Sequence, residues 1–205
     1  MEITLLLRGL VIGFSIAAPV GPIGVLCIRR TLADGRSLGI ASGLGAATAD
    51  AIYGCIAAFG LTFVSGFLVN QQTWLRLVGG LFLCYLGLKT ILNKPSARAV
   101  LANGMGLLGA FASTFFLTLT NPLTIISFVA IFAGLGLAGA SGSFLSAGVL
   151  VLGVFLGSAL WWLLLSGGFG MFRSKFNPDG LRWVNRISGA IIAGFGLLAL
   201  ASAIW

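Results

Sequence analysis

The carboxylate of Asp50 has the clearest capacity for chemistry in this sequence, because it lies well inside an apolar stretch. Desolvation penalises the charged form of a buried acid, so such a group can take up and release a proton near physiological pH. Small residues at three- and four-residue spacing share its helix face and would let helices approach closely: Gly39, Gly43, Ala46 and Gly54. We predict that Asp50 points inward as a proton-coupling residue; the alternative is a carboxylate fixed to an arginine or to hydroxyls that only holds helices together.

Two proline-containing breaks interrupt apolar stretches at matching places in the two halves of the chain. They are the segments Ala18-Pro19-Val20-Gly21-Pro22 and Thr120-Asn121-Pro122. Proline removes a backbone hydrogen bond, so a membrane helix keeps such a break only where protein or a wet cavity satisfies the freed groups. Each break therefore indicates either a binding cavity or, as the alternative, a plain proline kink.

The breaks predict a site for a zwitterion. Gly21-Pro22 and Asn121-Pro122 each suit a helix start, whose unpaired N–H groups and positive dipole end favour a carboxylate. The prolines should also free the carbonyls of Ser15, Ala18 and Thr118, which could accept hydrogen bonds from an ammonium group. The residues predicted to bind substrate at the breaks are Pro19, Gly21, Pro22, Asn121 and Pro122.

Further polar side chains could join this site. Thr114 and Thr118 share one helix face with Asn121 and are predicted substrate contacts, although hydroxyls in membrane helices often bond their own backbone instead. Arg29 and Arg30 end the first apolar stretch, and we predict them at a cytoplasmic mouth, where they would attract an anionic or zwitterionic substrate. The alternative is that both arginines only anchor the topology.

The elements that must position these residues are membrane-spanning helices. Of 205 residues, 59% are hydrophobic and 8% charged, which fits a polytopic all-α membrane protein and no soluble domain. We predict one transmembrane domain over residues 1–205 whose six apolar stretches can each cross a hydrocarbon core of about 30 Å. They are Leu5 to Ile28, Leu38 to Val69, Leu75 to Leu92, Leu107 to Leu137, Phe144 to Phe169, and Trp183 to Ile204.

Basic residues gather in the odd-numbered loops between these stretches: Arg29, Arg30, Arg36, Lys89, Lys94, Arg98, Arg173, Lys175, Arg182 and Arg186. Cytoplasmic loops collect Lys and Arg, so this pattern predicts that both termini are extracytoplasmic. It also explains the net charge of +8 without a nucleic-acid partner. Three spans in each half, approximately 1–103 and 104–205, predict two inverted repeats with broken first and fourth helices.

Several other classes of site are not indicated. Cys27, Cys55 and Cys84 show no metal-ligand spacing and the chain has no histidine, so we expect no metal, no cofactor and no enzyme activity. The glycine stripes Gly9 to Gly13 and Gly153 to Gly157 would either pack within the monomer or form a homodimer.

The chain resembles the LysE/RhtB superfamily of bacterial amino-acid exporters along essentially its whole length. The matching residues are Pro19 through Pro22, Arg29-Arg30, Gly35-Arg36, Asp50 and Thr120-Asn121-Pro122. The resemblance implies efflux of small amino acids or related metabolites, driven by proton or ion antiport across a bacterial inner membrane. Two positions depart from the family: Val20 stands where the first proline of its Pro-Gly-Pro turn usually falls, and Leu123 replaces a lysine that often follows Asn-Pro.

Residues and resemblance together predict a secondary active exporter. It would alternate access around a midplane site formed by the broken first and fourth spans and Asp50, with protons, substrate and the lipid bilayer as partners. Two alternatives stay open. One is a cation or metal efflux protein or channel that uses the freed carbonyls and Asp50, and the other is a noncatalytic membrane subunit.

Overall fold

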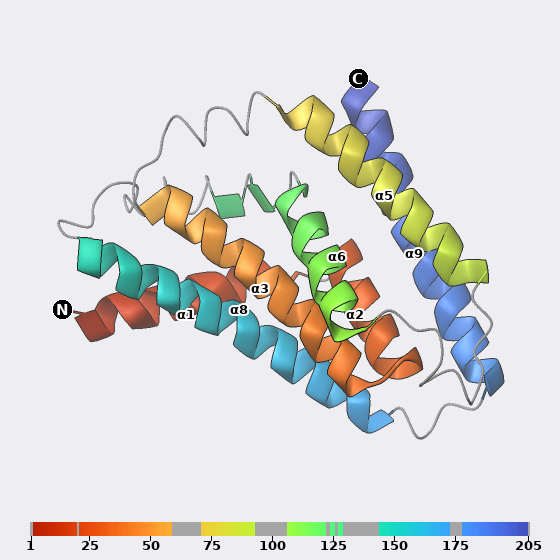
Figure 1. The fold of residues 1–205 in the computed structure, drawn as a ribbon, viewed down its shortest axis with the longest axis horizontal. Helices are drawn as coiled ribbons and strands as arrows, with labels where there is room; N and C mark the ends of the chain where they lie inside the picture. Colours follow the sequence, from red (N-terminus) through yellow and green to blue (C-terminus); the bar gives the residue numbers. More distant parts are fainter. Residues whose placement is uncertain are drawn as a thin grey trace.

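The computed structural model is helical throughout the elements that it describes (Figure 1). The described residues are 2–19, 21–58, 71–92, 106–121, 124–125, 127–128, 144–172 and 178–204. Their principal helices are α1 (Glu2–Ala17), α2 (Pro22–Ala33), α3 (Arg36–Ala58), α5 (Gln72–Leu92), α6 (Leu107–Leu119), α8 (Phe144–Phe172) and α9 (Pro178–Ile204). The all-α prediction is confirmed for this part of the chain, and α5, α8 and α9 fall on the third, fifth and sixth predicted spans.

Four of the described helices, α3, α5, α8 and α9, are long and apolar enough to cross a membrane. Helices α1 and α2 make a fifth candidate if they count as one broken span, since their directions differ by 82°. Helix α6 is shorter, and most of the predicted fourth span beyond it lies outside the described residues. The count of six spans and the placement of the termini therefore stay predictions.

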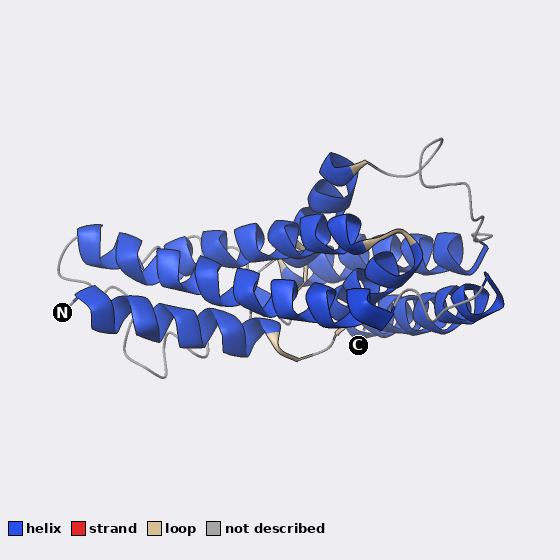
Figure 2. Ribbon diagram, turned by 90° about the horizontal axis from the view of Figure 1, so that it is seen from below, coloured by secondary structure: helices blue, strands red, loops and turns tan. Residues whose placement is uncertain are grey.

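The helices form two groups joined by α2. Helices α1, α3, α6 and α8 pack together, while α5 and α9 lie side by side as a separate pair (Figure 1). Helix α2 contacts α3 and α8 of the first group and α9 of the second. In the view turned by 90°, the long helices run in one general direction (Figure 2). Residues of α2 are thus placed to connect the two groups.

Glycine allows the closest helix contacts. Gly9 and Gly13 of α1 face Gly153 and Gly157 of α8, and a Cβ atom added at any of the four would overlap a backbone carbonyl oxygen of the facing helix. Both predicted glycine stripes therefore pack within the monomer, which is the first of the two alternatives stated for them. Small residues at a helix interface give this close approach in membrane proteins.

A tight turn joins α2 to α3 at Gly35. This residue has φ of 117°, a left-handed conformation that glycine adopts without steric penalty. The backbone N–H groups of Asp34 and Gly35 both donate to the Arg30 carbonyl oxygen at 2.9 Å, which ends α2. The turn brings the last residues of α2, including Arg29 and Arg30, beside the first turns of α3.

Candidate functional site

Asp50 lies in the contact between α3 and α8. Its side chain is 3% exposed, and the Ser158 hydroxyl donates a hydrogen bond to Oδ2 at 2.6 Å. The indole Nε1 of Trp162 in turn donates to Ser158 Oγ at 3.2 Å. No described residue forms an ion pair with Asp50. The predicted inward orientation of Asp50 is confirmed, and its role in proton coupling stays a prediction.

The small residues that accompany Asp50 explain how α8 can approach it. Cβ atoms added at Gly43 and Gly54 would contact Trp162 and Val154, both on α8. At Gly43 the added atom would overlap Trp162 and push the helices apart, which would move Ser158 away from the carboxylate, whereas at Gly54 it would make an ordinary van der Waals contact. The stripe predicted from spacing thus forms the surface of α3 that packs on α8.

One turn after Asp50, Tyr53 connects α3 to the end of α6. Its hydroxyl donates to the carbonyl oxygen of Leu119 at 2.5 Å, and its ring packs on Phe128 with 5.6 Å between ring centroids. Leu119 is the last residue of α6. The helix that holds the buried acid is therefore hydrogen-bonded to the residue just before the second break.

The second break has the geometry of a helix end followed by a helix start. The Asn121 N–H donates to the Thr118 carbonyl at 3.1 Å, and the Asn121 carbonyl accepts the N–H of Thr124 at 3.1 Å. Residues 124–125 are helical again, as predicted for an interruption at Asn121. The carbonyl of Thr118 was predicted to be free, but it accepts the Asn121 N–H because the chain tightens there. Pro122 lies outside the described residues.

At the first break, Gly21 is the N-cap of α2 and Pro22 is the first helical residue, as predicted. Pro22 is buried, Gly21 is half-buried and Pro19 is exposed. The Gly21 N–H donates to the Pro19 carbonyl at 2.9 Å, so this amide has a partner within the break itself. The break redirects the chain from α1 into α2.

The two threonines predicted as substrate contacts are fully buried in α6. Thr114 Oγ1 donates to the carbonyl of Ala110 at 2.9 Å, and Thr118 Oγ1 donates to the carbonyl of Thr114 at 2.8 Å. Both hydroxyls thus bond their own backbone, which is the structural alternative stated for them. Thr114 has a second role, because its oxygen also accepts a hydrogen bond from Arg30.

Arg30 of α2 is buried and binds neutral oxygens on α3 and α6. Its guanidinium group donates to Ser42 Oγ at 2.7 Å and, on α6, to Thr114 Oγ1 at 2.9 Å, Ser113 Oγ at 2.9 Å and the Ala110 carbonyl at 3.1 Å. The three hydroxyls donate their hydrogens to carbonyls of their own helices, so their oxygens act as acceptors toward Arg30.

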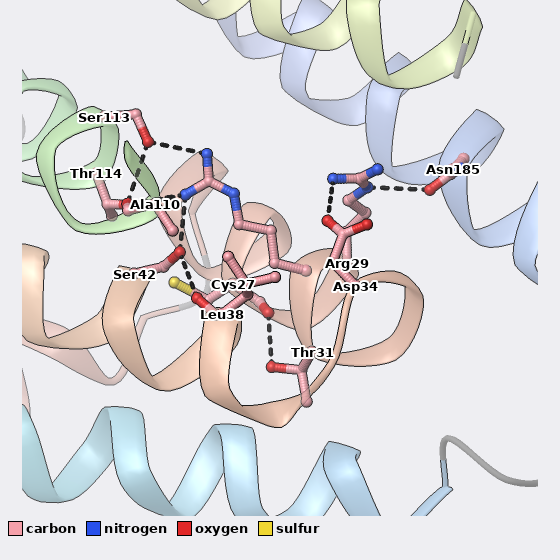
Figure 3. Close-up of polar contacts among 11 residues, drawn as sticks. Cys27, Arg29, Thr31, Asp34, Leu38, Ser42, Ala110, Ser113, Thr114 and Asn185 are labelled. Atoms are coloured by element: carbon pink, nitrogen blue, oxygen red, sulfur yellow. Dashed lines mark hydrogen bonds and ion pairs between the residues drawn. The ribbon is translucent and has the colours of Figure 1, made fainter. Parts of the chain in front are cut away.

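The neighbouring Arg29 points to the opposite side of α2 (Figure 3). Its Nε donates to Asn185 Oδ1 of α9 at 3.0 Å, and one terminal nitrogen forms an ion pair with Asp34 at 2.7 Å. The prediction that Arg29 and Arg30 belong to a loop was wrong, since both lie within α2 and are buried. In a loop, water would hydrate these guanidinium groups; here hydroxyls, an amide and a carboxylate accept their hydrogen bonds instead.

Two polar groups thus form from residues that were predicted separately. Asp50 of α3 bonds Ser158 of α8, while Arg30 of α2 bonds Ser42, which lies two turns before Asp50 along α3. Ser158, Ser113 and Asn185 were not predicted as partners of these charged side chains. Ser158 is polar in the middle of an apolar stretch, which was a signal, but serine is common enough in membrane helices that nothing distinguished it from the other serines of α8.

The forked contacts of Arg30 give a test of what holds α2 in place. A buried charge is retained at low energy only when its donors are satisfied, and the lysine ammonium lacks the planar fork that reaches α3 and α6 together. We expect Arg30→Lys to destabilise the protein by about 3 kcal/mol and Arg30→Met by about 1 kcal/mol, because the hydroxyls left behind keep their backbone bonds.

Apparent melting temperatures of the purified variants in detergent measure this difference. The matched control is the exposed pair Arg182→Lys and Arg182→Met, which should both melt like the wild type because a surface ion pair contributes little. A lower melting temperature for Arg30→Met than for Arg30→Lys would contradict this account of the buried charge.

Membrane-length apolar helices, with a helix break and buried charges beside them, are typical of membrane transport proteins. The comparison with protein families agrees, since residues 14–203 match the family described as LysE type translocator. The chain belongs to this translocator family.

Three relatives come from different bacteria. YcgF of Bacillus subtilis (strain 168), which bears the provisional name amino acid efflux protein, is 29% identical over 91% of this chain and 90% of its own length. YahN of Escherichia coli (strain K12), an uncharacterized membrane protein, is 27% identical over 83% of this chain and 77% of its own length. The uncharacterized membrane protein slr1627 of Synechocystis is 24% identical over 91% of each chain. No solved structure gives a significant match.

Proposed function

We propose that this chain is a secondary active exporter of amino acids or related small metabolites that takes up a proton in exchange, in a bacterial inner membrane. The proposed proton exchange rests on the burial of Asp50, whose carboxylate lies between α3 and α8 and accepts a hydrogen bond from a serine hydroxyl. Intramembrane acids in such positions mark proton pathways in transporters. The substrate class is supported by the name of YcgF and by the family.

Contacts between helices support an inverted repeat. Gly45 of α3 packs against the backbone of α6, where an added Cβ would meet the Phe111 carbonyl and the N atom of Phe115. Gly153 of α8 packs in the same way against α1, where a Cβ would meet the Leu6 carbonyl and the N atom of Leu10. Exchange of the two halves would map the first contact onto the second.

The contact between α3 and α8 also fits an interchange of the two halves of the chain. Asp50 and Ser158, which bond each other, are 108 positions apart, the same separation as between Gly45 and Gly153. A pair of equivalent positions that contact each other lies on the axis that relates two repeats. The proposed pseudo-twofold axis therefore passes beside Asp50, and both termini would be on the extracytoplasmic side by the positive-inside rule.

In the proposed cycle, substrate and proton compete for the centre of the protein. With the site open to the cytoplasm, substrate entry favours release of the proton from Asp50; with the site open to the outside, a proton from the medium neutralises Asp50 and substrate leaves. Two side chains connect the second break to α3. Arg30 bonds both α3 and α6, and Tyr53 of α3 bonds the end of α6, so movement at the break would reach α3 through them.

Uptake into inverted membrane vesicles tests the proposed function. Labelled amino acids are screened with and without an imposed pH gradient, acidic inside, and we expect at least one of them to accumulate above its external concentration only when the gradient is present. A protonophore should abolish that accumulation, and vesicles without the protein are the control. Correct insertion with no gradient-dependent uptake of any amino acid would contradict the proposed substrate class, and large electrical currents would indicate a channel instead.

A further inference from the structure

The side chains of Trp162, Ser158 and Asp50 form a hydrogen-bonded row with a fixed direction. An indole N–H can only donate, so Ser158 Oγ must act as acceptor toward Trp162. A serine hydroxyl has one hydrogen, and that hydrogen is directed to Asp50 Oδ2 at 2.6 Å. Both Ser158 and Trp162 are buried, so bulk water does not compete for their hydrogen bonds.

The Ser158 hydroxyl differs in direction from several other buried hydroxyls of the described helices. Four other buried hydroxyls of the described helices donate to a backbone carbonyl one turn earlier in their own helix: those of Thr31, Ser42, Thr114 and Thr118. That is the common behaviour of Ser and Thr in membrane helices. Ser158 instead donates across the helix interface, where its hydrogen bond favours the ionised carboxylate over the protonated one.

We propose that Ser158, oriented by Trp162, is a positioning residue that sets the pH at which Asp50 gains and loses its proton. The inference rests on the proposed function, because it concerns the residue assigned to proton coupling there. Ser158 is not itself a proton carrier. It acts through Asp50, by making the charged carboxylate tolerable in an apolar helix contact.

Other titratable groups near Asp50 are few among the described helices. Helices α6 and α8, which pack on α3, carry no charged or titratable side chain within their described bounds. The other elements that contact α3 carry Glu2 and Arg8 of α1, both exposed, Cys27, Arg29 and Arg30 of α2, and Asp34 directly after α2. Helix α3 itself carries Arg36, Tyr53 and Cys55. Arg30 bonds Ser42, which lies two turns from Asp50, roughly 12 Å along the helix, and the Tyr53 hydroxyl donates its hydrogen bond to the Leu119 carbonyl oxygen. Ser158 is the group of α8 that bonds the carboxylate directly.

The expected effect of removing this hydroxyl has a definite sign. In Ser158→Ala the ionised carboxylate loses its donor while desolvation remains, so Asp50 should keep its proton up to a pH about one to two units higher. Ser158→Thr keeps the hydroxyl and should restore the wild-type value. Trp162→Phe should shift the midpoint in the same direction by less, because Ser158 is then free to turn toward its own backbone. This variant lacks the fluorescent side chain, so its midpoint is followed by the infrared band of the protonated Asp50 carboxyl.

Fluorescence of Trp162 measures this shift without any substrate. The chain has five tryptophans, so the full-length protein with the other four replaced by phenylalanine is reconstituted in liposomes and titrated with pH. We expect one transition that is absent in Asp50→Asn and that moves upward in Ser158→Ala. The control is Ser166→Ala, which removes another buried serine of α8 that has no hydrogen-bond partner among the described residues.

The outcomes separate this inference from the proposed function. An unchanged midpoint in Ser158→Ala, an equal shift in Ser158→Thr or Ser166→Ala, or the lack of any transition that depends on Asp50 would overturn the role of Ser158. Failure of the exporter proposal appears elsewhere, as the absence of gradient-driven uptake in vesicles. A transition that shifts as expected in a protein that transports no amino acid would uphold this inference and refute only the substrate class.

Discussion

Asp50→Asn is expected to abolish pH-gradient-driven transport while the protein still folds and inserts. The amide has nearly the shape of the carboxylate, and its oxygen can still accept the Ser158 hydrogen bond, so the contact between α3 and α8 should persist. Asparagine does not titrate, however, and the exchange of substrate against a proton then has no carrier. In inverted vesicles the accumulation should fall to the external concentration, whereas exchange of labelled for unlabelled substrate should continue.

Two variants control for this result. Asp179→Asn makes the same chemical change at an exposed position, where the carboxylate pairs only with Arg182 on the surface, and it should transport like the wild type. Asp50→Glu keeps the titratable group and should retain part of the coupled transport. Accumulation by Asp50→Asn that still requires the pH gradient would remove Asp50 from the proton pathway and favour its alternative role in holding helices together.

The second large effect is expected at the contact between α1 and α8. The methyl group of Gly157→Ala would overlap the carbonyl oxygen of Leu10, and backbone atoms cannot rotate away as a side chain can. The helices must then separate, which loses contacts along the whole stripe, so we expect destabilisation of about 3 kcal/mol or more. The apparent melting temperature of the purified protein, together with the yield of monodisperse material, measures this loss.

Gly148 on the same helix provides a matched control. A Cβ atom added there would meet nothing within 4 Å, and alanine is the better helix former by up to about 1 kcal/mol. Gly148→Ala should therefore match or exceed the wild type. If Gly157→Ala were equally stable but lost self-association, its glycine stripe would serve a homodimer and not the monomer contact.

The sequence predicted those features that depend on local chemistry. Proline and glycine restrict the backbone wherever they occur, so the helix start at Pro22 and the interruption at Asn121 followed from a few adjacent residues. The inward orientation of Asp50 also followed, because the penalty for exposing a carboxylate to lipid is large and the small residues lie on its face. Such signals do not require knowledge of which helices are neighbours.

Features that depend on contacts between distant helices could not be obtained in the same way. Arg30 was interpreted as a residue of a loop, since arginine at the end of an apolar stretch is usually hydrated. Its burial depends on Ser42 and on hydroxyls of α6, and only the tertiary structure brings these together. The partner of Asp50 was unknown for the same reason, because the spacing along α3 contains no information about which residue of α8 faces it.

The position of the Asp50 bond along α8 bears on the electrical side of the proposed exchange. Ser158 is the middle residue of this helix, the longest of those described, so a proton that reaches Asp50 from either end has passed about half of the helix. Moving one charge across the whole membrane at 100 mV corresponds to about 2.3 kcal/mol, so each half of the proton's path would receive roughly 1.1 kcal/mol. The membrane voltage would then favour proton entry from outside and proton release to the cytoplasm to a similar extent, and collapsing the voltage alone should slow both steps.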